Sequence, residues 1–320
     1  MAEEVSIRQY EPGRDDETWA GTYNRARAEV PEFVPLKVEE LGRAQKTPWF
    51  KAEGEFIAEL DGTAVGTVSA YLRDSRKLRV GFIDGPNVVP EARRRGVGSA
   101  LMRKALESLR QRGATVAEDG AGDWNTPALA FLRKHGFEPS HTYSRMGRDL
   151  GPVPTGVGEN REVVLQPFGE SDEEVTTWHR LIQAAFAEYH NFEVMSLAEF
   201  IYFARHQRDG GGLFERYFAL VNGVPVGFLI IEIDRQENEK LGVRRGWVND
   251  IGVLKEHRGR GIGTRLLLHT LERLQALGME AAVLSVDDQN VTCARRVYER
   301  VGFRVVRCYT SFELALAPNS

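Results

Sequence analysis

Two stretches of the chain decide its fold: VVPEARRRGVG (residues 88–98) and VLKEHRGRGIG (residues 253–263). Both fit the pattern Val-x-x-x-x-Arg-x-x-Gly-x-Gly, and both run directly into a helical pattern of apolar residues. Their arginines, Arg93 and Arg258, are 165 positions apart, which is about the length of one ordinary domain. The chain is therefore predicted to contain one fold twice, not a short-period repeat.

Each stretch predicts a strand, a glycine-rich turn and a helix. Backbone N–H groups at a helix N-terminus point outward and the helix dipole favours negative charge there, so such a turn suits an anion. The turns lack the lysine of a nucleoside-triphosphate loop, and Leu101 and Leu266 stand where a dinucleotide-binding loop would have its third glycine. The pattern indicates a pyrophosphate held mainly by main-chain donors. A glycine-rich turn with no ligand is the alternative.

Arg-x-x-Gly-x-Gly after a strand, followed by an asparagine and a helix that closes on Gly-Phe, resembles the GCN5-related N-acetyltransferase (GNAT) family. The likeness covers nearly the whole chain, in two copies. It implies an α+β fold of two tandem domains, each a mixed, mainly antiparallel sheet flanked by helices. It also implies acetyl-coenzyme A as co-substrate, with the turn gripping its pyrophosphate and the preceding strand pairing with its pantetheine arm. The coenzyme-binding residues that the resemblance implies are Val88, Arg93, Gly96, Val97 and Gly98 in the first copy and Ile251, Val253, Arg258, Gly259, Arg260, Gly261, Ile262, Gly263 and Asn290 in the second.

The two halves differ where the family often places a general acid. Tyr298 lies four residues before Gly302, at a position where a tyrosine of the family protonates the coenzyme A thiolate. Leu132 holds the corresponding position of the first half, and leucine cannot donate a proton. The resemblance therefore implies catalysis in the second half. The alternative is that Tyr298 is a core aromatic, because apolar residues adjoin it at helical spacing.

Acetyl transfer also needs a base, because an alkylamine near neutral pH is almost entirely ammonium. Asp250 and Asp84 lie on the strands before the two turns. They are three and four residues before Val253 and Val88, so strand alternation predicts that they face opposite sides and that at most one occupies the equivalent place. We take Asp250 as the candidate base. A solvated carboxylate at a strand end is the alternative.

The order of predicted elements repeats along the chain. AspGly at 61 and AsnGly at 222 predict a two-residue hairpin turn at the same place in each half. The segment 151–161, rich in proline and glycine, is the expected linker between a first domain (1–150), which we expect to be degenerate as a catalyst or to serve as a coenzyme-binding partner, and a second, catalytic domain (162–320). Helices are expected at 16–27, 38–46, 99–112, 126–134, 173–188 and 197–206.

Composition restricts the function. The 320 residues are 42% hydrophobic, enough for two cores, and the net charge of −4 gives no basic footprint for nucleic acid. Neither a secretory signal nor an apolar run of membrane-spanning length is present, and Cys293 and Cys308 form no disulfide or metal pattern, so we expect a cytoplasmic protein without a metal. The expected function is direct acetyl transfer to a primary amine of a small molecule. An acetyl-coenzyme A sensor without turnover and a protein N-terminal or lysine acetyltransferase are the alternatives; the acceptor and the oligomeric state stay open.

Overall fold

The chain forms two compact units in the computed structural model, which describes residues 5–47, 50–74, 79–158, 160, 162–190, 192, 195–206, 212–290 and 294–316. Unit 1 consists of Met1–Ala121, Thr126–Ser140 and Ser311–Ser320, and unit 2 of Gly122–Asn125 and His141–Thr310. The segment 151–161 belongs to unit 2 in this grouping. Its role as a linker between domains stays a prediction.

Both units contain strands and helices, and three predicted helices (α1, α4 and α6) have the predicted bounds. Those of unit 1 are β1 (Val5–Gln9), α1 (Asp16–Arg27), α2 (Val38–Ala44), β2 (Glu55–Leu60), β3 (Thr63–Asp74), β4 (Arg79–Val88), α3 (Val97–Gln111), β5 (Val116–Gly122) and α4 (Thr126–Lys134). Those of unit 2 are β7 (Val164–Pro167), α5 (Asp172–Ala185), α6 (Leu197–His206), β8 (Leu213–Val221), β9 (Val224–Ile233), α7 (Arg235–Leu241), β10 (Arg245–Val253), α8 (Ile262–Ala276), β11 (Ala281–Asp287) and α9 (Ala294–Arg300). β6 (Glu138–Asp149) and β12 (Arg304–Ala315) contribute residues to both units. Among the described residues, no helix is both long and apolar enough to cross a membrane.

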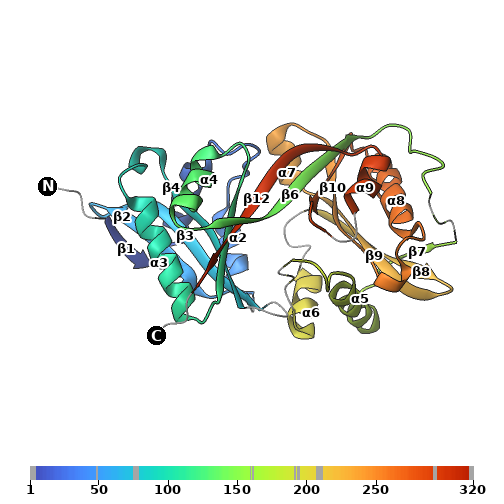
Figure 1. The fold of residues 1–320 in the computed structure, drawn as a ribbon, viewed down its shortest axis with the longest axis horizontal. Helices are drawn as coiled ribbons and strands as arrows, with labels where there is room; N and C mark the ends of the chain where they lie inside the picture. Colours follow the sequence, from blue (N-terminus) through green and yellow to red (C-terminus); the bar gives the residue numbers. More distant parts are fainter. Residues whose placement is uncertain are drawn as a thin grey trace. The chain divides into compact units, whose positions relative to one another are not determined.

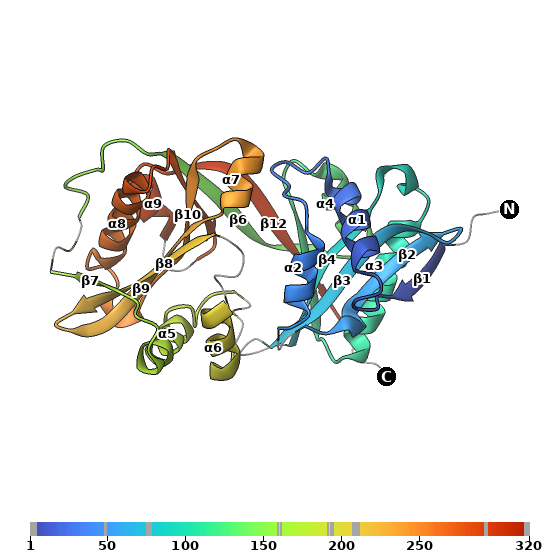
Figure 2. The same ribbon diagram turned by 180° about the vertical axis from the view of Figure 1, so that it is seen from behind.

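The sheet of unit 1 has the strand order β1-β2-β3-β4-β5-β12. Helix α3 lies against one face of this sheet, and α1 and α2 lie on the other, as the two views show (Figures 1 and 2). The apolar stripe of α3, which includes Leu101, Met102 and Leu109, is fully buried in the unit 1 core. Phe312 and Leu316 come from the far end of the chain and complete the same core.

The sheet of unit 2 has the order β6-β11-β10-β9-β8-β7, and alternation along β9 divides its two faces. Leu229 and Ile231 pack into the core beneath α8, whereas Phe228 and Ile230 pack with α5 and α6. Because directly paired residues of neighbouring strands share a face, this division tells which face each residue of β10 occupies.

Both hairpins have the predicted turn. Asp61 and Gly62 have φ of 49° and 75°, and Asn222 and Gly223 have φ of 51° and 78°. Leu60 pairs with Thr63 across the first turn, so two residues make the loop. Two successive positive φ angles are the requirement of the turn type that matches the twist of a hairpin, which is why the Asp-Gly and Asn-Gly pairs predicted these turns correctly.

A pair of parallel strands separates in each unit. β4 and β5 pair from Val80–Val116 to Phe82–Glu118, and the described parts of both strands continue beyond this point without further pairing. β10 and β11 pair only through residues 245–247 and 281–283, although they extend to 253 and 287. The unpaired ends of β4 and β10 lead into the two glycine-rich turns, so their backbone groups face an opening in the sheet.

Candidate active site

The turn of unit 2 exposes an unobstructed helix N-terminus. Gly259 and Gly261 have φ of 75° and 76°, a conformation in which a β-carbon is strained. Helix α8 has no side-chain cap, and its first backbone bond is donated by Arg265 to the carbonyl of Gly261. The N–H groups of the first turn therefore lack intrahelical acceptors. A β-carbon added at Gly263 would meet nothing within 4 Å, so an anion has room there.

The turn of unit 1 has the same backbone but less space. Gly96 has φ of 87°, and α3 also begins without a side-chain cap. A β-carbon at Gly98 would lie 3.5 Å from the ring of Phe131, which belongs to α4. His135 packs on Phe131 with ring centroids 4.5 Å apart, and its Nε2 lies 3.1 Å from the hydroxyl of Ser99. Phe131 of α4 and His135, which follows α4, therefore lie beside the N-terminus of α3.

Arg258, the arginine of the second motif, is bound by the protein itself. Its Nε donates to the carbonyl of Val253 at the end of β10 (3.1 Å), and its Nη2 donates to the carbonyl of Ala185 at the end of α5 (2.9 Å). Its Nη1 forms an ion pair with Glu188 (2.8 Å). Each of the three guanidinium nitrogens thus makes one bond, and together the bonds join β10, the turn and the end of α5.

Arg93 makes the same three bonds in unit 1. It donates to the carbonyls of Val88 (3.1 Å) and Ala26 (3.0 Å) and pairs with Glu29 (2.8 Å). The bonds therefore show which residues of α1 and α5 are equivalent in the two copies of the fold, with Ala26 of unit 1 equivalent to Ala185 of unit 2. The coenzyme-binding role that the resemblance implies for both arginines stays a prediction, and the bonds indicate that they shape the turn.

The strand residues that we expected at the coenzyme lie next to this opening. Ile251 and Val253 of β10 are partly buried against the unit 2 core, and Val88 of β4 is partly buried against the core of unit 1. Ile262 and Val97, the first residues of α8 and α3, are almost fully buried and anchor the helix ends. Arg260, in the second turn, is exposed.

Asp250 lies on the α5–α6 face of unit 2. Val253 pairs with Gly227 and Asp250 pairs with Ile230, three residues farther along β9. Ile230 packs with α5 and α6, so the Asp250 side chain points to the same side. A register shift between Val248 and Asp250 marks a β-bulge directly beside the carboxylate.

The prediction that Asp84 and Asp250 face opposite sides was wrong. In unit 1, Val88 pairs with Gly66 and Asp84 pairs with Ser69, again three residues farther along. β4 has one residue more than β3 at this place: Asn87 pairs with Thr67 and Asp84 pairs with Ser69, so a register shift lies between the two pairs. A bulge adds one residue to one strand only, so the count along the strand no longer gives the face.

Asp250, Tyr189 and Tyr298 form an electrostatically coupled group. Burial raises the pKa of Asp250 to about 6, and no described residue gives its carboxylate a hydrogen bond or an ion pair. Burial, with the charges of Tyr189 and Asp250, raises the pKa of Tyr298. Burial, with the charges of Asp287 and Asp250, raises the pKa of Tyr189 to about 12. Both phenols therefore stay protonated at neutral pH and can donate a proton.

Tyr298 is 8% exposed and lies in the unit 2 core, with its ring 6.3 Å from that of Phe303. Within the described residues its hydroxyl has no hydrogen-bond partner, so the tyrosine is both a core aromatic and a donor without an assigned acceptor. Leu132 is 2% exposed and packs in the unit 1 core. Asn290 follows β11, with its N–H donating to the carbonyl of Asp287.

Sequence reasoning missed Tyr189, because it follows α5 in an irregular segment where no pattern assigns a role. Cys308 lies on β12, with its sulfur 4.0 Å from the hydroxyl of Ser144, and Cys293 lies outside the described residues. The structure gives no contact of Cys308 with the Asp250, Tyr189 and Tyr298 group.

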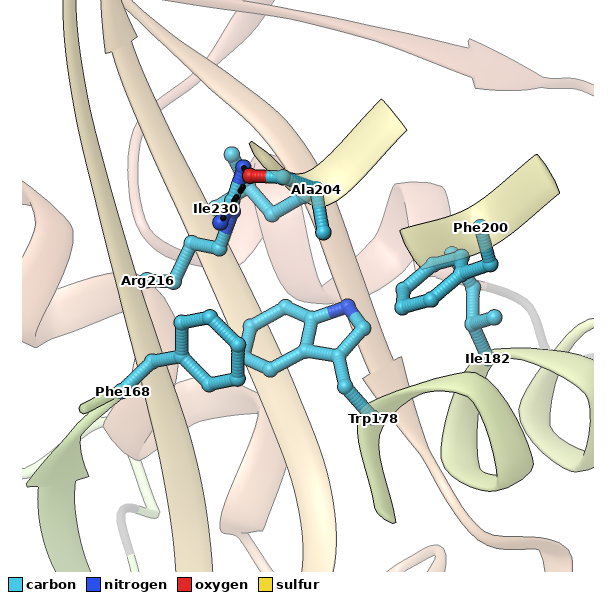
Figure 3. Close-up of a pocket in the computed structure, with 7 residues that line it drawn as sticks. All are labelled: Phe168, Trp178, Ile182, Phe200, Ala204, Arg216 and Ile230. Atoms are coloured by element: carbon cyan, nitrogen blue, oxygen red, sulfur yellow. Dashed lines mark hydrogen bonds between the residues drawn. The ribbon is translucent and has the colours of Figure 1, made fainter. Parts of the chain in front are cut away.

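A small cavity lies beside Ile230, between the sheet and helices α5 and α6 (Figure 3). Its volume is about 10 Å³, which is room for about one water molecule, so it is a packing gap in this conformation. Arg216 closes one side and donates to the carbonyl of Ala204 (3.2 and 3.3 Å), as the dashed lines show. Trp178 and Phe200 form much of the remaining wall.

Comparison with known proteins gives the same two-fold division. The model of the acetyltransferase (GNAT) family matches residues 19–137 and 175–303, together more than half of the chain. Mycothiol acetyltransferase of Thermobispora bispora is 36% identical over 140 residues, which are 43% of this chain and 48% of that protein. Mycothiol acetyltransferase of Streptomyces griseus is 33% identical over 137 residues, 43% and 44% of the two chains. The chain spans about half the length of these relatives.

Solved structures resemble the chain over its full length. A GCN5-related N-acetyltransferase from Sphaerobacter thermophilus has a TM-score of 0.70 and 21% identity, covering 99% of this chain and 97% of its own. A tandem GNAT protein from the clavulanic acid biosynthesis pathway has a TM-score of 0.72 and 19% identity, covering 99% and 100%. At these identities the likeness shows the fold alone.

Proposed function

Because the chain belongs to the GNAT family of acetyltransferases, we propose that its second unit moves an acetyl group from acetyl-coenzyme A to a primary amine of a small molecule. One observation carries the proposal: the strand that leads into the open anion site of α8 also carries Asp250, whose charge acts on the phenol of Tyr298. The name mycothiol acetyltransferase, borne by relatives of this chain, supports a small acceptor. We place the reaction in the cytoplasm, as the sequence leads us to expect.

The residues around the second turn fit acetyl-coenzyme A. The N–H groups of Ile262, Gly263 and Thr264 suit its pyrophosphate, since the space in front of Gly263 is empty of protein atoms. The unpaired backbone of β10 next to β11 suits an extended arm that adds amide hydrogen bonds to a strand. When bound, the coenzyme supplies the activated acetyl thioester.

Asp250 and Tyr298 take opposite parts in the transfer. With a pKa of about 6, Asp250 is mostly ionised at neutral pH and basic enough to accept a proton from an ammonium acceptor, directly or through water. The amine nitrogen then forms the new bond to the acetyl carbon as the bond to sulfur breaks. Tyr298 donates its hydroxyl proton to the departing sulfur, which leaves as the thiol. The nitrogen, which now carries one proton too many for an amide, loses that second proton, and it returns to the Tyr298 oxygen directly or through water. The products are the amide and the thiol, and Asp250 then releases its proton to solvent.

Unit 1 serves another purpose in this proposal. Leu132 replaces the tyrosine, and the ring of Phe131 lies beside Gly98 at the helix N-terminus, where unit 2 has open space at Gly263. Both observations favour a unit that retains the fold and contributes stability or substrate shape instead of turnover. Weak coenzyme binding in unit 1 remains compatible with the exposed backbone of its turn.

The test combines turnover with binding in two matched variants. Release of thiol from acetyl-coenzyme A in the presence of amines measures transfer. Calorimetry on Gly263→Val and Gly98→Val measures acetyl-coenzyme A binding, because added bulk blocks close approach to the backbone. We expect Gly263→Val to remove tight binding and turnover, and Gly98→Val to preserve turnover. The opposite pattern, or no amine-dependent thiol release, would overturn the proposal.

A further inference from the structure

Two carboxylates share the α5–α6 face of the unit 2 sheet. Asp250 pairs with Ile230, and Glu232 lies two residues beyond Ile230 on β9, hence on the same face. Diagonal neighbours of this kind on adjacent strands have Cα atoms roughly 7–8 Å apart. Side chains of this length can therefore hold two charged groups of one small molecule.

Among the residues that the structure describes, neither Asp250 nor Glu232 forms an ion pair. Glu232 accepts a hydrogen bond from the Asn249 side chain (2.8 Å), an amide that carries no charge. Burial raises the pKa of Glu232 to about 7, and the charges that add to this rise are those of Asp234, Glu237 and Asp250. Buried carboxylates are ordinarily paired with a cation, so an arrangement in which each neighbour is another acid is costly without a ligand.

The cations that lie near this face are engaged elsewhere. Arg216 pairs opposite Ile230 in the sheet, but its guanidinium donates to the Ala204 carbonyl (Figure 3). Arg245 forms an ion pair with Glu237 at 2.8 Å. Neither arginine contributes to the pKa of Asp250, which burial alone raises.

Unit 1 shows what the equivalent carboxylate binds. Asp84, at the register position of Asp250, forms an ion pair with Arg27 of α1 (3.2 Å). The Arg27 guanidinium also lies over the rings of Tyr23 (5.1 Å) and Phe33 (5.8 Å), an arrangement that favours a cation. The duplicated fold thus carries a cation of its own at this carboxylate in unit 1.

Unit 2 lacks that internal cation. The arginine bonds that align α1 with α5 place Phe186 at the position of Arg27, so an apolar ring replaces the guanidinium. At the position of Glu232, unit 1 has Tyr71, whose ring stacks on Phe82. Unit 1 has instead a carboxylate on β2 near Asp84: Glu55 pairs with Ser69, the partner of Asp84, and accepts a hydrogen bond from the Ser69 hydroxyl (2.5 Å). A carboxylate at the Glu232 position, without the arginine of α1, is thus the arrangement of unit 2.

Resting on the acetyl transfer proposed above, we propose that the acceptor of unit 2 is a small amine with at least two positively charged nitrogens. Asp250 receives the nitrogen that becomes acetylated, and Glu232, held by Asn249, binds the second ammonium group. Glu232 is a specificity-determining residue in this arrangement, because it contacts a part of the acceptor that does not react. A monoamine of the same length fills only the Asp250 position.

The experiment compares 1,4-diaminobutane and 1,5-diaminopentane with butylamine, with thiol release as the readout. We expect kcat/KM for the diamines to exceed that for butylamine about tenfold or more, since a hydrogen bond to a charged group contributes about 1.5–3 kcal/mol. Glu232→Gln should remove this preference by raising KM for the diamines at least tenfold more than KM for butylamine. Glu239→Gln, which removes the same charge from an exposed position on α7, is the matched control and should change neither.

Equal kcat/KM for monoamine and diamines, or an equal loss for both in Glu232→Gln, would overturn the proposal. Calorimetry of 1,4-diaminobutane with the protein saturated with coenzyme A separates this inference from the transfer reaction. Diamine binding that depends on Glu232, in a protein that releases no thiol, supports the cation site and contradicts the proposed function. Absence of Glu232-dependent binding together with turnover of butylamine supports the function and refutes the cation site.

Discussion

Asp250→Asn should make the protein more stable and almost inactive. A carboxyl held at a pKa of about 6 instead of 3.8 costs the folded state about 3 kcal/mol at neutral pH, because each tenfold change in ionisation corresponds to about 1.4 kcal/mol. The side chain keeps some contact with solvent, which lowers this cost, so we expect a gain of about 1–3 kcal/mol and a rise of several degrees in the melting temperature of unit 2. Loss of the base should reduce kcat by roughly 10²- to 10⁴-fold.

The difference in stability between Asp250→Asn and the parent protein should grow as the pH rises. Below pH 3.8 the Asp250 carboxyl is protonated in both the folded and the unfolded chain, so it costs the folded state nothing. Between pH 3.8 and about 6 the unfolded chain loses the proton first, and the stability of the parent protein falls relative to the variant. Above about pH 6 the difference is complete and constant.

Thermal melts and amine-dependent thiol release, each measured from pH 4 to pH 8, provide the assay. Asp84→Asn is the matched control, because Asp84 has the equivalent register but an ion pair with Arg27, with 44% of its side chain exposed. A partly exposed pair contributes about 0–1 kcal/mol, so the control should lose a little stability and keep its kcat. If Asp250→Asn melts at a lower temperature than the parent at pH 7, then the buried charge does not destabilise the folded state. If it turns over at a rate similar to the parent, then Asp250 is not the base.

Four other substitutions separate chemistry from packing. Tyr298→Phe should lower kcat roughly 10²- to 10⁴-fold with little change in coenzyme affinity or melting temperature; full turnover would remove its role as acid. Leu132→Ala should cost about 2–5 kcal/mol of unfolding free energy without a specific loss of kcat, measured by denaturant titration, because a buried side chain leaves a cavity. Arg258→Met should both lower the melting temperature and raise the Kd for acetyl-coenzyme A, since three bonds are lost; a higher Kd at unchanged stability would instead indicate direct contact with the pyrophosphate. Cys308→Ala should retain activity, because transfer is direct, and an acetylated cysteine trapped by mass spectrometry would contradict this.

Local chemistry made much of the fold predictable from sequence. Asp-Gly and Asn-Gly pairs readily adopt the two positive φ angles that a two-residue hairpin turn requires, so they predicted both hairpins. The apolar stripe of α3 identified its buried face, since Met102, Ala105, Leu106 and Leu109 recur at helical spacing and are all buried. The repeated turn located both helix N-termini, because its glycines adopt the positive φ angles that the turn demands.

Features that depend on pairing partners were not predictable. The bulge in β4 altered which face Asp84 occupies, and nothing in the strand itself states the register of its neighbour. Helix α7 has no buried residue and therefore no apolar stripe; only its cap at Asp234 and the left-handed Gly242 mark its ends. Two of the three bonds of Arg258 reach residues about 70 positions earlier in the chain, so the motif identified the arginine but not these partners.

The return of residues 311–316 to unit 1 sets an order of assembly during synthesis. Phe312 belongs to the unit 1 core, Ser311 donates to Glu118 (2.8 Å), and the N–H of Leu316 donates to the carbonyl of Thr115. These residues follow all of unit 2 in the chain. The half that is translated first therefore emerges from the ribosome without its final strand, and it must wait, open along β5, until the half that carries Asp250 has already been made.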